Sequence, residues 1–254
     1  MPTRFRLFAA AAMVLFALAP AAAPAQDFSP AQRSQIESVI RDYLLKNPEL
    51  LQEVMGELEK KQAAAEVAKH KAAIAQHADI LFSSPRQVTI GNPQGDVTFV
   101  EFFDYNCGYC KRAMADMLEL MKDPKLKVVL KEFPVLGPGS VEAAQVAVAV
   151  RMQDKSGKKY LDFHQRLLGS RGQADKARAL AAAKEAGLDM ARLEKDMVSA
   201  EVQTSLQESF KLAESLGLNG TPSYVIGNEV VVGAVGLAAL REKVNTARCG
   251  KAVC

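Results

Sequence analysis

The sequence predicts an α/β domain that carries a helical insertion between its two halves and a helical extension at its N-terminus. Three patterns support this prediction. An apolar run typical of a strand, 97–103, leads into a helical pattern that starts near Cys107. Residues 140–217 then have almost entirely helical periodicity, and strand-like alternation returns at 223–232. A chain of 254 residues is long enough for one such domain and an appendage.

Residues 1–25 have the composition of a secretion signal. Arg4 and Arg6 precede the apolar run 7–18, which is too short to span a bilayer comfortably. Small residues at 23 and 25 fit a cleavage site, so we expect a mature chain that begins at Gln26 in the oxidising periplasm. An uncleaved membrane anchor is the alternative. Removing Arg4 and Arg6 lowers the net charge from +3 to +1, which gives no electrostatic reason to expect a nucleic-acid partner.

Residues 26–78 predict a helical N-terminal extension. Ser29-Pro30 is typical of a helix start, and Asn47-Pro48 restarts the helix. The two segments carry apolar stripes at helical spacing: Ile36, Val39, Ile40, Tyr43 and Leu44 in the first, and Leu50, Leu51, Val54, Met55 and Leu58 in the second. The polar stretch 61–77 fits an extended helix or linker that separates these stripes from the domain. We therefore expect the extension to mediate self-association, with packing onto its own domain as the alternative.

The domain itself is expected to cover residues 79–254, with the helical insertion at about 139–217. We expect strands at 88–90, 97–103, 126–133, 223–226 and 229–232, and helices at 111–122, 160–168, 174–186 and 236–247. Ser140 and Asp189 are candidate N-caps within the insertion. Gly227-Asn228, between the last two strands, is a signal for a two-residue hairpin turn.

Cys107-Gly108-Tyr109-Cys110 follows the strand 97–103 at the start of a helix. Backbone N–H groups and the helix dipole stabilise a thiolate there, so we expect Cys107 to be an exposed nucleophile. Cys110 continues the helical stripe of Met114 backward, so it should face the core and act as the resolving thiol. The pattern favours thiol–disulfide exchange. A permanent disulfide, or a zinc site completed by the pair at 249 and 254, is the alternative.

Glu101 is the acidic residue of the strand before the cysteines, six residues ahead of Cys107. If this carboxyl group is buried, its pKa should rise, and it could pass a proton to or from Cys110. Strand alternation could instead turn Glu101 to solvent.

The remaining candidates for redox or metal chemistry are expected to be structural. Cys249 and Cys254 should form a disulfide with each other in an oxidising compartment, with a second redox or metal role as the alternative. Thioethers at Met114, Met117 and Met121 could bind copper(I), but their helical spacing favours core packing. His164 should be structural or exposed. We predict neither a metal nor a cofactor.

The segment Phe102–Cys110, together with Gly220-Thr221-Pro222, resembles the thioredoxin-fold DsbA-like family over about residues 85–248. The helical block matches that family's inserted domain. The resemblance implies a cis bond before Pro222, opposite the cysteines, that exposes the backbone of Thr221 to an extended substrate. It also implies an acidic residue at the position of Glu101. From the sequence alone, an ordinary turn proline is the alternative.

The whole chain is most similar to ScsC-type and Com1-type periplasmic proteins, which carry a helical N-terminal extension. ScsC-like members with this extension are homotrimers, so the resemblance implies a trimer. Gly108-Tyr109 and Thr221 match isomerase-type members better than the oxidase. We therefore predict a periplasmic protein disulfide isomerase or reductase. Its partners would be unfolded or wrongly disulfide-bonded secreted proteins and a membrane redox protein. The alternatives are a monomeric DsbA-like dithiol oxidase and a non-catalytic copper-binding or chaperone module.

Overall fold

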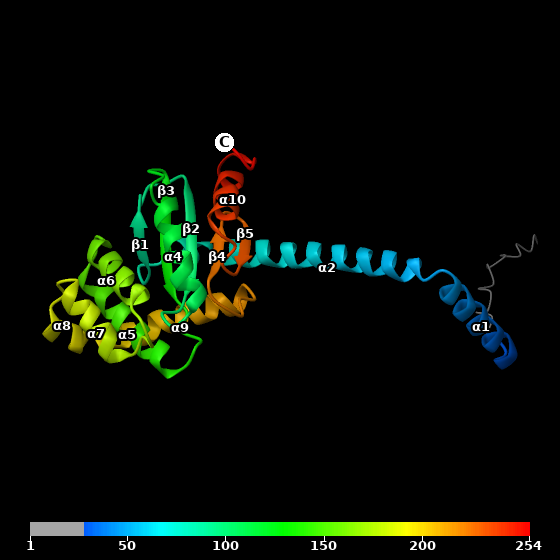
Figure 1. Ribbon diagram of the computed structural model, residues 1–254, viewed down its shortest axis with the longest axis horizontal. Helices are drawn as coiled ribbons and strands as arrows, with labels where there is room; N and C mark the ends of the chain where they lie inside the picture. The colour runs from blue at the N-terminus through cyan, green and yellow to red at the C-terminus, as the bar shows by residue number, and fades with distance from the viewer. Residues whose placement is uncertain (1–27) are drawn as a thin grey trace, which may run out of the picture. The chain divides into compact units, whose positions relative to one another are not determined.

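The computed structural model describes residues 28–254 (Figure 1), and the expected secretion signal at 1–25 lies outside the described residues. The described residues divide into two compact units, 28–58 and Glu59–Cys254. The helices are α1 (Pro30–Lys46), α2 (Glu49–Gln76), α3 (Ala78–Ser83), α4 (Gly108–Leu120), α5 (Pro138–Gln153), α6 (Lys158–Gly169), α7 (Lys176–Glu185), α8 (Met190–Met197), α9 (Ala200–Ser215) and α10 (Leu237–Cys249). The strands are β1 (Val88–Gly91), β2 (Val97–Phe103), β3 (Leu126–Glu132), β4 (Ser223–Ile226) and β5 (Glu229–Val232). Over the described range, no helix is both long and apolar enough to cross a membrane.

The N-terminal unit begins with a capping box that confirms the predicted helix start. The backbone N–H of Gln32 donates to Ser29 Oγ at 3.3 Å, and the Ser29 N–H donates to the Gln32 side chain at 2.9 Å. Most large apolar side chains of this unit are exposed, whereas Leu44 and Leu50 are half-buried. The exposed ones are Phe28, Ile36, Val39, Ile40, Tyr43, Leu45, Leu51, Val54, Met55 and Leu58. The stretch 61–77, expected as an extended helix or linker, is helical as far as Gln76 and forms the second half of α2.

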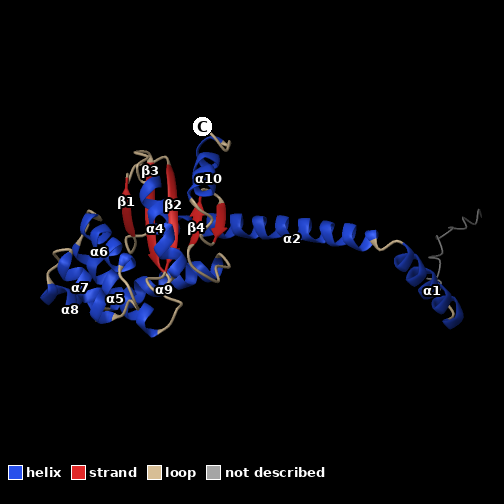
Figure 2. Cartoon of the chain, viewed as in Figure 1, coloured by secondary structure: helices blue, strands red, loops and turns tan. Residues whose placement is uncertain are grey.

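The domain is built on one mixed sheet with the strand order β1-β3-β2-β4-β5 (Figure 2). The central strands β2 and β3 are parallel, and the other neighbouring pairs are antiparallel. Each expected strand is present within about a residue at each end. The Gly227-Asn228 turn joins β4 to β5, with Ile226 paired to Glu229.

Strand β2 is buried on both faces, which explains its nearly continuous apolar sequence. Phe99 and Phe103 point into the larger core, which includes residues of α4, α6 and α10. Val100 and Phe102 point into a second core on the other face, which contains Ile74 of α2 together with residues of α3 and α9. By alternation, Glu101 shares the face of Phe99 and Phe103 and lies under α4.

The helical insertion comprises α5 to α9, and Figure 1 shows α5 to α8 gathered at the β1 side of the sheet. Asp189 caps α8 as predicted, since its side chain accepts the N–H of Arg192 at 3.1 Å. The prediction of Ser140 as a cap is wrong. Helix α5 already begins at Pro138, because proline at the first helical position favours an earlier start after Gly137.

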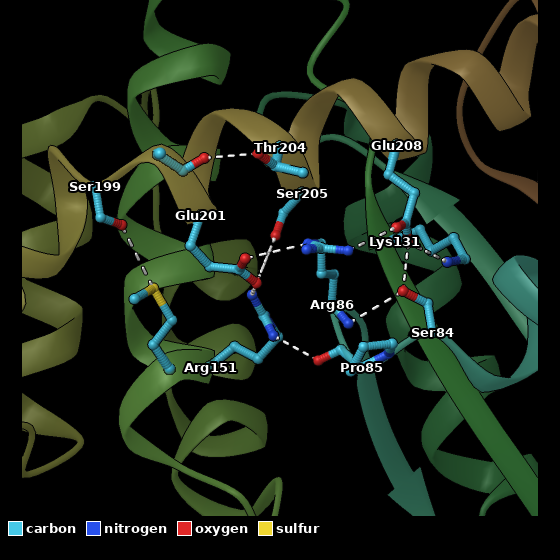
Figure 3. Close-up of polar contacts among 12 residues, drawn as sticks. Ser84, Pro85, Arg86, Lys131, Arg151, Ser199, Glu201, Thr204, Ser205 and Glu208 are labelled. Atoms are coloured by element: carbon cyan, nitrogen blue, oxygen red, sulfur yellow. Dashed lines mark hydrogen bonds and ion pairs between the residues drawn. The ribbon is translucent and has the colours of Figure 1, made fainter.

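A network of charged side chains joins the insertion to the sheet (Figure 3). Arg151 of α5 donates to Glu201 of α9 at 2.8 Å and to the carbonyl oxygen of Pro85 at 2.8 Å. Lys131 of β3 is buried and lies 3.9 Å from Glu208 of α9. Burial lowers the pKa of Lys131 to about 8. The network thus joins α5 to α9 and to the segment before β1, and it joins α9 to β3.

Candidate active site

Cys107 occupies the N-cap position of α4. Its sulfur accepts the backbone N–H of Cys110 at 3.3 Å, and as a thiol it donates to the carbonyl oxygen of Thr221 at 3.1 Å. The pKa of Cys107 is lowered to about 5, chiefly by a hydrogen bond from the Cys110 thiol. The Thr221 side chain and the backbone N–H groups of Cys110 and Tyr109 lower this pKa further, while burial opposes them. Cys107 is therefore a thiolate at neutral pH.

The expectation that Cys107 is exposed is wrong, because its side chain is only 5% exposed. The Thr221-Pro222 segment, which is distant in sequence, lies against the sulfur and buries it. The local helix pattern around Cys107 contains no information on this long-range contact. Gly108 and Tyr109 are the exposed part of the motif. The Tyr109 ring is 60% exposed and carries the Arg112 guanidinium at 4.3 Å from its centroid.

Cys110 faces the core, as expected from the helical stripe. It is 1% exposed, and both Cys107 and Cys110 are free thiols. The pKa of Cys110 is raised well above its ordinary range, first because its thiol donates to Cys107 and then because of burial. The two sulfurs therefore differ sharply: Cys107 has lost its proton at neutral pH, and Cys110 has kept its proton.

Glu101 is only 4% exposed. Of the two orientations expected for this side chain, the structure therefore has the buried one. Burial, and then the charge of Cys107, raise the pKa of Glu101 to about 8. The negative charge of Glu101 in turn contributes to the raised pKa of Cys110. A carboxyl group that titrates near neutral pH beside a buried thiol has the chemistry needed to exchange a proton with that thiol.

The peptide bond between Thr221 and Pro222 is cis, and Pro222 is buried. The structure thus brings Thr221 to the cysteines across more than a hundred residues of sequence.

Cys249 and Cys254 form a disulfide with each other at the end of α10, with their Cα atoms 6.2 Å apart. This bond contradicts the alternative of a zinc site shared with Cys107. Among residues 28–254, no group of three or more His, Cys, Asp or Glu side chains is placed to hold a metal ion.

Most of the domain matches the sequence model of one known protein family. The DSBA-like thioredoxin domain matches residues 98–245. The chain belongs to the DsbA-like thioredoxin family. The N-terminal domain of the copper resistance protein ScsC matches residues 32–65, which cover most of α1 and the first part of α2. The DsbA-like match includes Glu101, both cysteines of the motif, Thr221 and Pro222, whereas the 249–254 disulfide lies outside it.

Known relatives and solved structures are consistent with this family. A thioredoxin-like oxidoreductase from Silicibacter pomeroyi is 46% identical, with a TM-score of 0.63 over 67% of this chain and 96% of that one. Proteus mirabilis ScsC in a transitional conformation is 30% identical, with a TM-score of 0.64 over 88% of this chain and 98% of that one. The thiol:disulfide interchange protein DsbA of Bordetella pertussis is 26% identical over 56% of this chain and 68% of that protein. The chain also aligns, at 26% identity, with 24% of the length of the Na(+)/H(+) antiporter NhaA 1 of Salinispora arenicola.

Sequence reasoning missed Asp104, which organises the loops around the cysteines of this DsbA-like domain. Its buried carboxylate accepts the backbone N–H groups of Asn106 at 2.7 Å, Val135 at 2.8 Å and Leu136 at 3.0 Å. It also accepts the hydroxyl of Ser140 at 2.7 Å, which is the contact that this side chain makes in place of a helix cap. An Asp at the end of a strand, followed two residues later by Asn, is a turn signal that could have identified the first of these bonds.

His164 and the methionine stripe belong to the core of the domain. His164 is 1% exposed, and its Nδ1 lies 3.2 Å from the Tyr105 hydroxyl. Burial lowers the pKa of His164 to about 3, so the ring is neutral at physiological pH. Met117 is buried, and Met114 and Met121 pack against the same core, as their helical spacing predicts.

Proposed function

We propose that this DsbA-like protein is a periplasmic disulfide isomerase or reductase that acts on secreted proteins through Cys107 and Cys110. The observation that carries the proposal is the difference between the two sulfurs. Cys107 is a thiolate whose pKa is about 5, and the buried Cys110 beside it retains its proton. A thiolate attacks disulfides, and a protonated neighbour can resolve the product once it loses its proton.

The exchange begins when the Cys107 thiolate attacks one sulfur of a substrate disulfide. A mixed disulfide forms, and the other substrate sulfur leaves with the bonding electron pair. In isomerisation, substrate thiolates then rearrange and one of them displaces Cys107, so no net oxidation or reduction occurs. In reduction, Cys110 passes its proton to Glu101 and attacks Cys107. The Cys107–Cys110 disulfide forms, and the substrate keeps two electrons as two thiols.

The charge of Cys107 controls when Glu101 can accept this proton. In the resting protein, the thiolate contributes to the raised pKa of Glu101, about 8, and so favours a protonated carboxyl group. The mixed disulfide removes the charge of Cys107, so the pKa of Glu101 falls. More of Glu101 is then a carboxylate that can accept a proton, at the step at which Cys110 must lose its own proton.

Exposed apolar side chains beside the motif support binding of an unfolded substrate. Tyr109 lies within the motif, and Val135 and Leu136 lie in the loop that Asp104 holds by two backbone hydrogen bonds. We propose that these side chains contact apolar segments of the substrate, and that the backbone of Thr221 pairs with its extended chain.

The exposed stripes of the N-terminal unit support assembly. Most large apolar side chains of 28–58 are exposed, and residues 32–65 match the ScsC N-terminal domain. We propose that a secreted chain, cleaved before Gln26, assembles through these stripes into a trimer. Several motifs around one substrate would favour isomerisation, because the substrate stays bound while its disulfides are exchanged. Assembly would also hinder re-oxidation by the membrane partner of an oxidase.

The decisive experiment is recovery of activity from a test enzyme with scrambled disulfides. The exported protein is compared with its Cys107→Ser variant, and Cys254→Ser serves as a matched control that alters a cysteine outside the site. Recovery that needs Cys107 but not Cys254 supports the proposal. Efficient oxidation of a reduced substrate without recovery would indicate a dithiol oxidase. Failure of both reactions would favour a copper-binding or chaperone module.

A further inference from the structure

Tyr224, on β4, has a buried hydroxyl group that has no role in the exchange steps proposed above. The side chain is 1% exposed, and its ring packs against Phe99 with 5.1 Å between the centroids. Among the described residues, the Tyr224 hydroxyl is one of four buried side-chain atoms without a hydrogen-bond partner. Buried tyrosine hydroxyls usually find a partner, so this one needs an explanation.

Two other buried tyrosines of the domain show the ordinary arrangement. The Tyr160 hydroxyl donates to Glu132 at 2.6 Å, and it lies 3.3 Å from the hydroxyl of Tyr105. Both of these phenols therefore have partners in the resting protein, and Tyr224 differs from them.

The groups around Tyr224 are those of the reacting centre. Tyr224 is the direct antiparallel partner of Glu101, and alternation places both side chains on the face covered by α4. Negative charge on Glu101, Cys110, Asp116 and Cys107 acts on the phenol, with Glu101 first. Burial, and then these charges, raise the pKa of Tyr224 above its ordinary range. The hydroxyl therefore stays protonated, and it is available as a donor when negative charge develops on Glu101 or Cys110.

We propose that Tyr224 is a positioning residue for the resolving step, and that its hydroxyl donates a hydrogen bond to the negative charge as this charge passes from Glu101 to Cys110. The proposal rests on the exchange function proposed above. A donor that is already in place when charge develops lowers the barrier without reorganisation.

The resolving step transfers one proton and exchanges one disulfide bond. In the mixed disulfide, the proton of Cys110 moves to the carboxylate of Glu101, and the Cys110 thiolate attacks the sulfur of Cys107. The Cys107–Cys110 bond forms as the bond from Cys107 to the substrate breaks, and the substrate sulfur leaves with the electron pair. The negative charge thus moves from Glu101 to Cys110 and then to the leaving sulfur. Tyr224 keeps its proton throughout.

This role predicts opposite effects on stability and on rate. The unpaired hydroxyl costs stability in the resting protein, so Tyr224→Phe should unfold at the same or a higher temperature when reduced. The same variant should resolve the mixed disulfide more slowly. A residue that served only packing would not combine these two effects.

The experiment mixes the reduced full chain with oxidised glutathione and follows the mixed disulfide by acid quench and mass spectrometry. In Tyr224→Phe, formation of the mixed disulfide should keep its wild-type rate. Its conversion to the Cys107–Cys110 disulfide should slow about tenfold at neutral pH, the effect of one hydrogen bond to a charged group. The rising limb of the pH–rate profile should also move to higher pH, because loss of the donor raises the pKa of Glu101.

Tyr160→Phe is the matched control, since it removes a hydroxyl that has a partner. It should lower the unfolding temperature and leave the resolution rate unchanged. Wild-type resolution and pH profile in Tyr224→Phe would overturn the role of Tyr224 and leave the exchange function intact. A lower unfolding temperature or failure to fold would also overturn it, because the hydroxyl would then have a partner at rest. A wild-type protein that forms no mixed disulfide would overturn both proposals.

Discussion

The low pKa of Cys107 depends on its neighbour Cys110, and replacing that neighbour measures the dependence. The largest cause of the lowered pKa is the hydrogen bond from the Cys110 thiol. Cys110→Ala removes this donor and keeps the backbone N–H groups of residues 109 and 110 at the start of α4. The substitution therefore separates the contribution of the second thiol from that of the helix N-terminus.

The size of the change follows from the strength of one hydrogen bond to a charged group. Such a bond stabilises by about 1.5–3 kcal/mol, which corresponds to roughly 1–2 pKa units. From a pKa of about 5, Cys107 should therefore move to about 6–7 in Cys110→Ala. It should remain below the ordinary value of 9.0, because Thr221 and the backbone N–H groups still favour the thiolate.

The assay is the ultraviolet absorbance of the thiolate as a function of pH, with the double variant Cys107→Ser, Cys110→Ala as the baseline. The rate of alkylation of Cys107 over the same pH range gives an independent value. An unchanged pKa of about 5 would refute the reasoning, since the helix start alone would then account for the thiolate. A return to the ordinary value would refute it in the other direction, because the backbone donors would then contribute nothing.

Three further predictions concern the base, the loops and the assembly. Glu101→Gln should keep the attack of Cys107 on a disulfide but lose the rising limb in the pH profile of the resolving step, as stopped-flow kinetics would show. Asp104→Ala should destabilise the fold by about 1–3 kcal/mol in urea denaturation, because it removes the acceptor of four hydrogen bonds, among them that of the buried Ser140 hydroxyl. A midpoint equal to wild type would contradict this. Replacing Leu51 and Met55 by Asp should lower the mass in light scattering and shift activity from isomerisation toward oxidation; unchanged mass and activity would exclude assembly through this stripe.

Features set by local sequence could be predicted, and the structure contains them. The helix start at Ser29-Pro30, the N-cap at Asp189 and the hairpin at Gly227-Asn228 each depend on residues within a few positions of one another. The placement of Cys107 at a helix start is local in the same sense. A family resemblance was needed to connect this motif with Thr221, because spacing carries no information on contacts across a long insertion.

Features set by distant segments could not be predicted from periodicity. Cys107 is buried because the Thr221-Pro222 segment covers it, and Ser140 contacts Asp104 because the loop after β3 lies against the loop before α4. The orientation of Glu101 was open for another reason. Strand β2 is apolar on both faces, so alternation alone gives Glu101 no outward side.

The shared charge of the site also makes a prediction about stability. Between pH 5 and the ordinary value of 9.0, Cys107 is deprotonated in the folded reduced protein and protonated in the unfolded chain. The unfolded state binds more protons over this range, so the thiolate stabilises the reduced fold as pH rises, and this contribution is lost as pH falls through about 5. The oxidised protein has no thiol to titrate and lacks this contribution.

The raised pKa of Glu101 acts in the opposite direction, since its protonated carboxyl group stabilises the fold at low pH and this contribution is lost as pH rises through about 8. Its main cause is burial, which both redox forms share, so most of it cancels when the two forms are compared. The unfolding temperature of the reduced protein should therefore rise relative to that of the oxidised protein from pH 5 toward pH 9. A difference that stays constant with pH would mean that the fold does not stabilise the thiolate of Cys107.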